Sequence, residues 1–92
     1  MIARRIVVHG RVHGVGYRDA MTDAARRARV AGWVRNRMDG TVEVFVQGEP
    51  DAVAAAIAWC GRGPPAARVT SVDVTDTALD ADARAFVMKP TV

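Results

Sequence analysis

The sequence lacks several features that mark particular classes of protein. It contains a single cysteine, Cys60, which rules out an intrachain disulfide framework and a zinc site built from cysteines. No apolar run approaches the roughly 20 residues that cross a bilayer. The N-terminus also lacks the apolar core of about 7–15 residues that a secretory signal needs. We therefore expect a soluble, cytoplasmic protein with no membrane segment.

Lysine is nearly absent, since twelve of the thirteen basic residues are arginines. The formal net charge of +3 is compatible with nucleic acid, an acidic surface or a small anion as partner. The arginines are scattered along the chain rather than gathered in one tract. Charge alone therefore does not choose among these partners, and a solvated surface is the ordinary explanation.

The rest of the sequence is typical of one folded domain, spanning residues 1–92. Hydrophobic periodicity predicts strands over residues 4–9, 32–36, 41–48, 68–75 and 85–89. It predicts helices from about residue 17 to 31 and from residue 50 to the glycine- and proline-rich break at 61–67. Gly32 is expected to end the first helix, and Pro50 to begin the second. Asp39-Gly40 predicts a tight turn.

The order β-α-β-β-α-β, with an added C-terminal strand, predicts an α+β ferredoxin-like sandwich. Its mainly antiparallel sheet should carry two helices on one face. In this topology the first two strands run parallel, with the third between them. Their carboxyl ends should lie about 10 Å apart at one edge of the sheet. The loop that follows residue 9 and Asn36 should therefore flank a gap with room for a phosphoryl group and one water. The pattern does not decide which edge the last strand joins.

The loop Gly10–Arg18, GRVHGVGYR, has the features of an anion site. Its three glycines allow successive N–H groups to turn inward, and the helix that follows adds unpaired N–H groups. Arg18 is poorly placed for helix stability at the positive end of the helix dipole, which makes it a candidate to grip phosphate oxygens. Turn-forming glycines, a surface arginine and a turn-forming Asn36 remain open alternatives on these residues alone.

At these residues the sequence resembles the acylphosphatase family. Family members carry a loop G-[KR]-V-Q-G-V-x-[FY]-R, a strand G-W-V-x-N and a turn ending D-G-x-V. The matching segments here are residues 10–18, 32–36 and 39–42, and the resemblance covers nearly the whole chain. It implies hydrolysis of small-molecule acyl phosphates to a carboxylate and inorganic phosphate, without a metal or cofactor. Nothing in the sequence demands more than a monomer or identifies the physiological substrate.

The resemblance also implies the role of each site residue. Arg18 and Asn36 are the catalytic pair, in which Arg18 binds the phosphoryl oxygens and Asn36 orients the attacking water. The loop amides that bind the phosphate together with Arg18 belong to His13, Gly14, Val15, Gly16 and Tyr17.

Two residues of the loop depart from the family pattern. His13 stands where glutamine is usual, which is harmless if the position contributes only its N–H. The hypothesis that its imidazole adds pH dependence is tested by comparing pH–rate profiles of the wild type and His13→Gln. Tyr17 replaces a common phenylalanine, and we expect its hydroxyl to reach solvent or a loop partner.

Other polar residues are interpreted as structural. Cys60 lies on the apolar stripe of the second helix, so we expect a core thiol rather than a nucleophile. His9 ends the first strand and is expected to have a packing or surface role.

Three alternative functions are weighed against hydrolysis. RNA-recognition domains share this element order and stack bases on open-face aromatics, but the third strand offers only Phe45 and the basic-aromatic signature is absent. A domain of a larger maturation enzyme that handles carbamoyl phosphate would carry the same motifs, although a final strand before Val92 favours a free-standing enzyme. An anion-binding fold without activity is disfavoured because Arg18 and Asn36 are both present.

Overall fold

The computed structural model describes every residue from Met1 to Val92. Its elements follow the order expected from the sequence. In chain order they are β1 (Ile2–Arg11), α1 (Tyr17–Ala28), β2 (Ala31–Asn36), β3 (Val42–Gly48), α2 (Pro50–Arg62), β4 (Arg68–Asp76) and β5 (Phe86–Met88).

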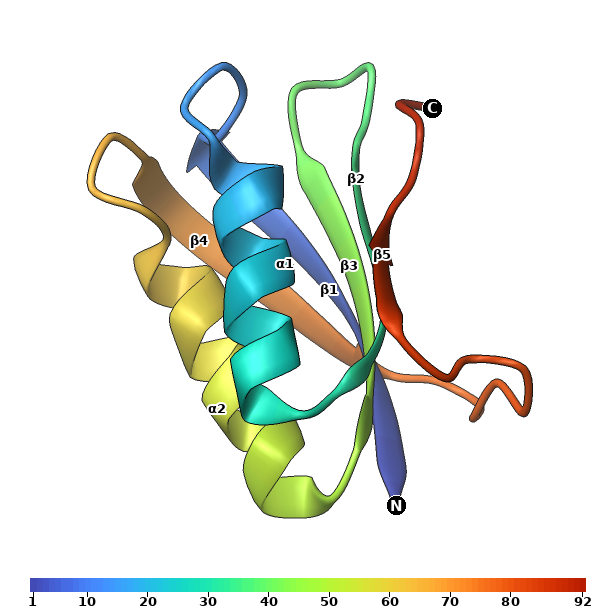
Figure 1. Ribbon diagram of the computed structural model, residues 1–92. Helices are drawn as coiled ribbons and strands as arrows, with labels where there is room; N and C mark the ends of the chain where they lie inside the picture. Colours follow the sequence, from blue (N-terminus) through green and yellow to red (C-terminus); the bar gives the residue numbers. More distant parts are fainter.

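The strands form one sheet in the order β4-β1-β3-β2-β5, and both helices cover the same face of it (Figure 1). β3 lies between β1 and β2 and pairs antiparallel with each, so β1 and β2 run parallel. The ferredoxin-like prediction is confirmed. β5 pairs in parallel with β2, which places the added strand at the β2 edge of the sheet.

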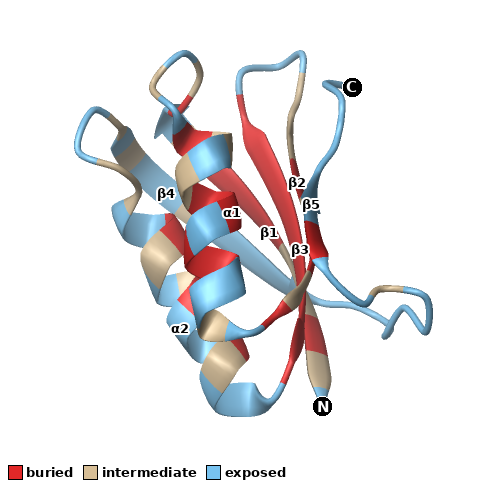
Figure 2. Ribbon diagram, viewed as in Figure 1, coloured by how far each residue is buried: buried red, intermediate tan, exposed pale blue.

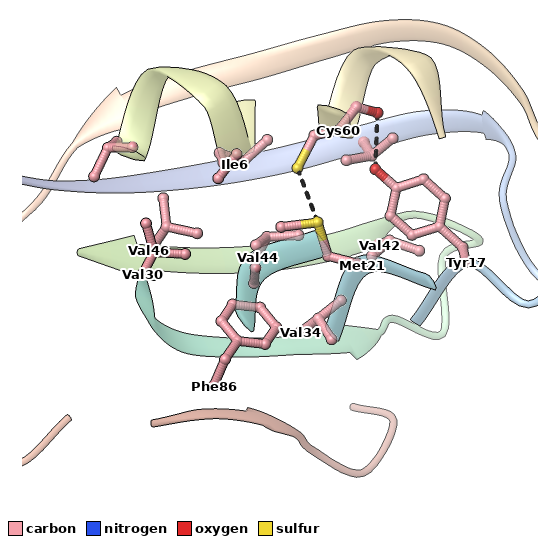
Figure 3. Packing of buried hydrophobic residues seen from close by; sticks show 14 of the residues in the cluster. Ile6, Tyr17, Met21, Val30, Val34, Val42, Val44, Val46, Cys60 and Phe86 are labelled. Carbon is pink, nitrogen blue, oxygen red and sulfur yellow. Dashed lines mark hydrogen bonds between the residues drawn. The ribbon is translucent and has the colours of Figure 1, made fainter. Parts of the chain in front are cut away.

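The hydrophobic core lies between the helices and the sheet (Figure 2). Val42, Val44 and Val46 are fully buried, as the alternating pattern of β3 predicted. Above the sheet, Met21 of α1 and Cys60 of α2 meet with their sulfur atoms 3.5 Å apart (Figure 3). This contact joins the two helices within the core that covers one face of the sheet.

The predicted end of α1 is wrong. The helix stops at Ala28 rather than Ala31, because Arg29 adopts the left-handed conformation with φ 63°. The N–H groups of Arg29 and of the next residue bond back to carbonyls of the last turn, which is a Schellman motif. Gly32 lies inside β2 instead, where an added Cβ would stand 1.8 Å from the carbonyl oxygen of Phe45. Close approach of two strands, not a helix end, requires this glycine.

Neither helix has the length and apolar character that crossing a bilayer demands.

Candidate active site

The β1–α1 loop and the end of β2 lie at the same end of the sheet, where β1 and β2 finish, as the topology predicted (Figure 1). Between them is a cleft of about 230 Å³. The residues that line it are Val12, Gly14, Gly16, Tyr17, Arg18, Asp19, Asn36 and Met88. The structure thus brings together the two residues assigned to catalysis from the sequence, Arg18 and Asn36.

A larger cleft, of about 450 Å³, lies at the other end of α1. Its polar lining includes Arg26, Arg29 and Arg84, but it contains neither the glycine loop nor Asn36. We assign the candidate active site to the smaller cleft, because it gathers the groups able to bind a phosphoryl group and a water molecule.

The loop of the smaller cleft has backbone N–H groups with no partner in the protein. None of the N–H groups from Val12 to Asp19 donates a hydrogen bond within the chain. Gly14 and Gly16 have φ values of 70° and 77°, in the left-handed region that favours glycine. Gly16 is also the N-cap of α1 and supplies no side-chain cap. Unpaired donors at the positive end of a helix form a site suited to an anion.

Arg18 and Asn36 present side chains that the protein leaves unpaired. Arg18 joins none of the ion pairs in the structure, and the side-chain amide of Asn36 makes no hydrogen bond to the chain. Their backbones are held, since the Arg18 carbonyl accepts the Thr22 hydroxyl and Asn36 pairs with Val42 in the sheet. Both side chains are therefore anchored at the base and available to a ligand.

Three residues of the cleft lining were not identified from the sequence, namely Val12, Asp19 and Met88. Met88 is 40% exposed and comes from β5, where it pairs with Val34 of β2. Its presence depends on the sheet edge that β5 joins, which the sequence pattern left undecided. Side chains alternate between the two faces of a strand, so Met88 lies on the same face of β5 as the buried Phe86. This two-residue period was the signal in the sequence that could have indicated which way Met88 points.

Two of the predicted phosphate-binding residues turn their side chains away from the cleft. Val15 packs against the hydrophobic core. The His13 ring lies with Nε2 2.9 Å from the backbone carbonyl oxygen of Thr41. The prediction for both positions concerned their N–H groups, which are among the unpaired donors.

The prediction for the Tyr17 hydroxyl is wrong. Tyr17 is 2% exposed, and its hydroxyl donates a hydrogen bond to the carbonyl of Cys60 at 2.8 Å (Figure 3). Its ring packs edge-on against Trp59, with centroids 5.3 Å apart. Burial, reinforced by the neighbouring Cys60, raises the pKa of Tyr17 far above its ordinary value. Tyr17 therefore anchors the start of α1 to the end of α2.

The interpretation of Cys60 as a core thiol is confirmed. Its side chain is fully buried, and burial raises the pKa of Cys60 to about 12. The residue is thus a neutral thiol at neutral pH, without the thiolate that a nucleophilic cysteine needs.

On the face of the sheet that no helix covers, the aromatic side chains are packed against other residues. Phe45 is 8% exposed and stacks against Trp33, with ring centroids 6.1 Å apart. The cationic groups of Arg35 and Lys89 lie 4.6 Å and 4.8 Å from the centroid of the Trp33 ring. The aromatic side chain on which an RNA-binding interpretation depended is covered by the protein's own residues.

Comparison with known proteins identifies the family of this chain. The acylphosphatase family model matches residues 4–88. An acylphosphatase of an Acidovorax species is 53% identical over 91 residues, covering 99% of this chain and 93% of the relative. The acylphosphatase of Acidiphilium cryptum is 48% identical and is covered over 99% of both chains.

Solved structures share the fold. The crystal structure of acylphosphatase from Bacillus subtilis superimposes with a TM-score of 0.92 and 35% identity, over 97% of this chain and 99% of that one. Full-length HypF contains a similar domain, with a TM-score of 0.87 and 25% identity over 98% of this chain and 12% of that one. On the family match and the near full-length identity to its relatives, the chain belongs to the acylphosphatase family of hydrolases.

Proposed function

We propose that the cleft hydrolyses acyl phosphates by transferring the phosphoryl group to water, with Arg18 and Asn36 as the catalytic residues. The water oxygen forms a bond to phosphorus as the bond between phosphorus and the carboxylate oxygen breaks. The products are a carboxylate, inorganic phosphate and a proton. The observation that carries the proposal is the run of unpaired N–H groups from His13 to Arg18 beside a cleft that Arg18 lines.

These donors match the charge that has to be bound. In phosphoryl transfer through a loose transition state, negative charge is spread over three equatorial oxygens. The planar guanidinium of Arg18 can donate to two of them at once, and the loop amides can donate to the others. Preorganised donors of this kind stabilise the transition state without reorganising during the reaction.

Asn36 is suited to orient the nucleophile. Its side-chain amide offers both a hydrogen-bond acceptor and donors, so it can fix a water molecule without removing its proton. β2 presents this amide across the cleft from the glycine loop. The leaving carboxylate is a weak base and needs no strong general acid, so positioning and charge stabilisation can account for catalysis.

The proposal extends to substrate and assembly. The substrate is a small-molecule acyl phosphate, hydrolysed without a metal or cofactor, as the family resemblance implies. We expect a monomer to be active, because one chain supplies Arg18, Asn36 and the β1–α1 loop that together line the cleft. We also propose that it acts in the cytoplasm, a reducing compartment with which its single free cysteine is compatible.

The direct test is release of phosphate from benzoyl phosphate by the purified chain, with and without EDTA. The wild type should hydrolyse it equally fast in both conditions, and Arg18→Gln should lose nearly all turnover. Phenyl phosphate, an ester with a poorer leaving group, serves as the control substrate, and the wild type should release no phosphate from it. An inactive wild type would overturn the hydrolytic proposal, and activity lost to EDTA would overturn its metal-free form.

A further inference from the structure

His13 makes a contact that the proposed mechanism does not yet use. Its half-buried ring places Nε2 2.9 Å from the carbonyl oxygen of Thr41. A carbonyl oxygen only accepts hydrogen bonds, so Nε2 must carry the hydrogen and donate. In the neutral ring this selects the Nε2–H tautomer.

The acceptor belongs to a turn that is itself well held. The Thr41 carbonyl also accepts the N–H of Arg37 at 2.9 Å, which closes the turn between β2 and β3. Asp39 accepts hydrogen bonds from the hydroxyl and the N–H of Thr41, at 2.6 Å and 3.0 Å. These bonds, the hydroxyl's first, lower the pKa of Asp39. Because Arg37 directly follows Asn36, the Thr41 carbonyl is fixed relative to the catalytic amide.

The loop that contains His13 has few other ties. Within residues 12–16, the only other hydrogen bond is the one that the Gly16 carbonyl accepts from Ala20, inside the first turn of α1. Val12 and Val15 pack against the core and hold the loop by its apolar side. The hydrogen bond from His13 is therefore the polar link between the phosphate-binding loop and the turn beside Asn36. The loop and this turn stand next to each other at one end of the molecule (Figure 1).

We propose that His13 is a positioning residue that sets the distance between the loop amides and Asn36. This inference rests on the proposed function, in which the loop holds the phosphoryl group and Asn36 holds the water. Attack requires the water and phosphorus to be aligned, and a misplacement of about 1 Å can cost on the order of 100-fold in rate. The role requires a hydrogen-bond donor and not an imidazole, so the glutamine usual in the family can serve equally.

The test compares His13→Leu, which fills the site without a donor, with His13→Gln, which restores one. His13→Leu should lower kcat for benzoyl phosphate on the order of 10-fold, with a smaller change in inhibition by inorganic phosphate, because alignment suffers more than binding. His13→Gln should recover kcat to within about twofold of the wild type. His9→Ala is the matched control, because it removes an imidazole that hydrogen-bonds to Asp73 and not to Thr41. Its kcat should be unchanged.

A second measurement does not depend on turnover. Nitrogen-15 NMR of the His13 ring at high pH should show the Nε2–H tautomer. A ring in the Nδ1–H tautomer, undiminished kcat in His13→Leu, or a His13→Gln variant as slow as His13→Leu would each overturn the positioning role. Failure of the proposed function itself is distinguishable, because the wild type would then not hydrolyse benzoyl phosphate.

Discussion

The hydroxyl of Tyr17, the first residue of α1, donates a hydrogen bond to the carbonyl of Cys60 in the last turn of α2. Carbonyls in a last turn have no partner within their helix. The residue that would follow in helical register, Pro64, has no N–H to offer. Tyr17 therefore satisfies a buried carbonyl that the chain around α2 leaves unpaired, and it ties the helix that carries Arg18 to its neighbour.

Tyr17→Phe should lower the free energy of unfolding by about 1–3 kcal/mol, because it leaves this carbonyl buried and unsatisfied. Urea titration measures the loss. At temperatures where the variant stays folded, its kcat should remain close to that of the wild type, since the hydroxyl takes no part in the chemistry. Unchanged stability would show that the bond contributes nothing net.

Arg18→Gln should lower kcat about 100- to 1,000-fold, the usual cost of one preorganised donor, and should raise KM. Arg18→Lys should recover only part of the loss, because an ammonium group lacks the planar fork that grips two oxygens. Arg27→Gln, an exposed arginine on the same helix, is the control and should behave as the wild type. Steady-state kinetics with benzoyl phosphate measure all three, and equal activity in Arg18→Gln and Arg27→Gln would refute the assignment.

Asn36→Ala should reduce kcat strongly while inhibition by inorganic phosphate stays nearly unchanged. In the proposed mechanism the amide acts on the water and the loop binds the phosphate, so catalysis and binding should separate. Competitive inhibition by phosphate, measured beside kcat, tests this separation. A normal kcat in Asn36→Ala would contradict the role in orienting water.

The element order, the parallel pair β1 and β2, and the meeting of the glycine loop with Asn36 could all be predicted from the sequence. They follow from hydrophobic periodicity and from the handedness of strand crossovers, which are local or general rules. The end of α1 at Ala28, with Arg29 as its left-handed cap, could not be predicted in this way. An arginine whose backbone adopts the left-handed conformation is uncommon, and a glycine such as Gly32 is the more usual residue just after the end of a helix.

The site details that were missed depend on packing between distant segments. Met88 enters the cleft only because β5 joins the β2 edge of the sheet, and the sequence pattern was compatible with either edge. The bond from His13 to Thr41 spans 28 residues, and that from Tyr17 to Cys60 spans 43. No motif of adjacent residues encodes either contact.

The bond from His13 to Thr41 also bears on the pH–rate profile. The ring donates through Nε2–H whether it is neutral or protonated, so protonation leaves this bond intact. We therefore expect the pH–rate profiles of the wild type and His13→Gln to superimpose. Profiles that diverge at acidic pH would show that the charge of the imidazole reaches the loop, as the alternative hypothesis holds.

Glu43 should make the fold sensitive to acid. It is 5% exposed and accepts hydrogen bonds from Arg5 and Arg35 at 2.6 Å and 2.7 Å. Burial by itself would raise the pKa of Glu43, but the bonds from Arg35 and Arg5 outweigh it, and the pKa is lowered. A carboxyl whose pKa is lower in the folded state stabilises the fold fully above its unfolded pKa of about 4.3, and this stabilisation is lost as the pH falls through the folded value.

Glu43→Gln should therefore be less stable than the wild type at neutral pH, by about 1–3 kcal/mol, and the difference should shrink as the pH falls below about 4. Urea unfolding across this pH range measures it. Glu49→Gln changes an exposed glutamate at the N-cap of α2 that forms no ion pair, so its stability should stay within about 1 kcal/mol of the wild type throughout. A constant difference between Glu43→Gln and the wild type at all pH values would contradict the assignment.

The most direct test of the mechanism is the fate of the water oxygen. Benzoyl phosphate hydrolysed by the chain in water enriched in oxygen-18 should yield labelled inorganic phosphate and unlabelled benzoate, because in the proposed mechanism the loop and Arg18 hold the phosphoryl group for attack on phosphorus. Label found in benzoate would mean that water attacks the carbonyl carbon, and it would contradict the roles given to Arg18, the loop amides and Asn36.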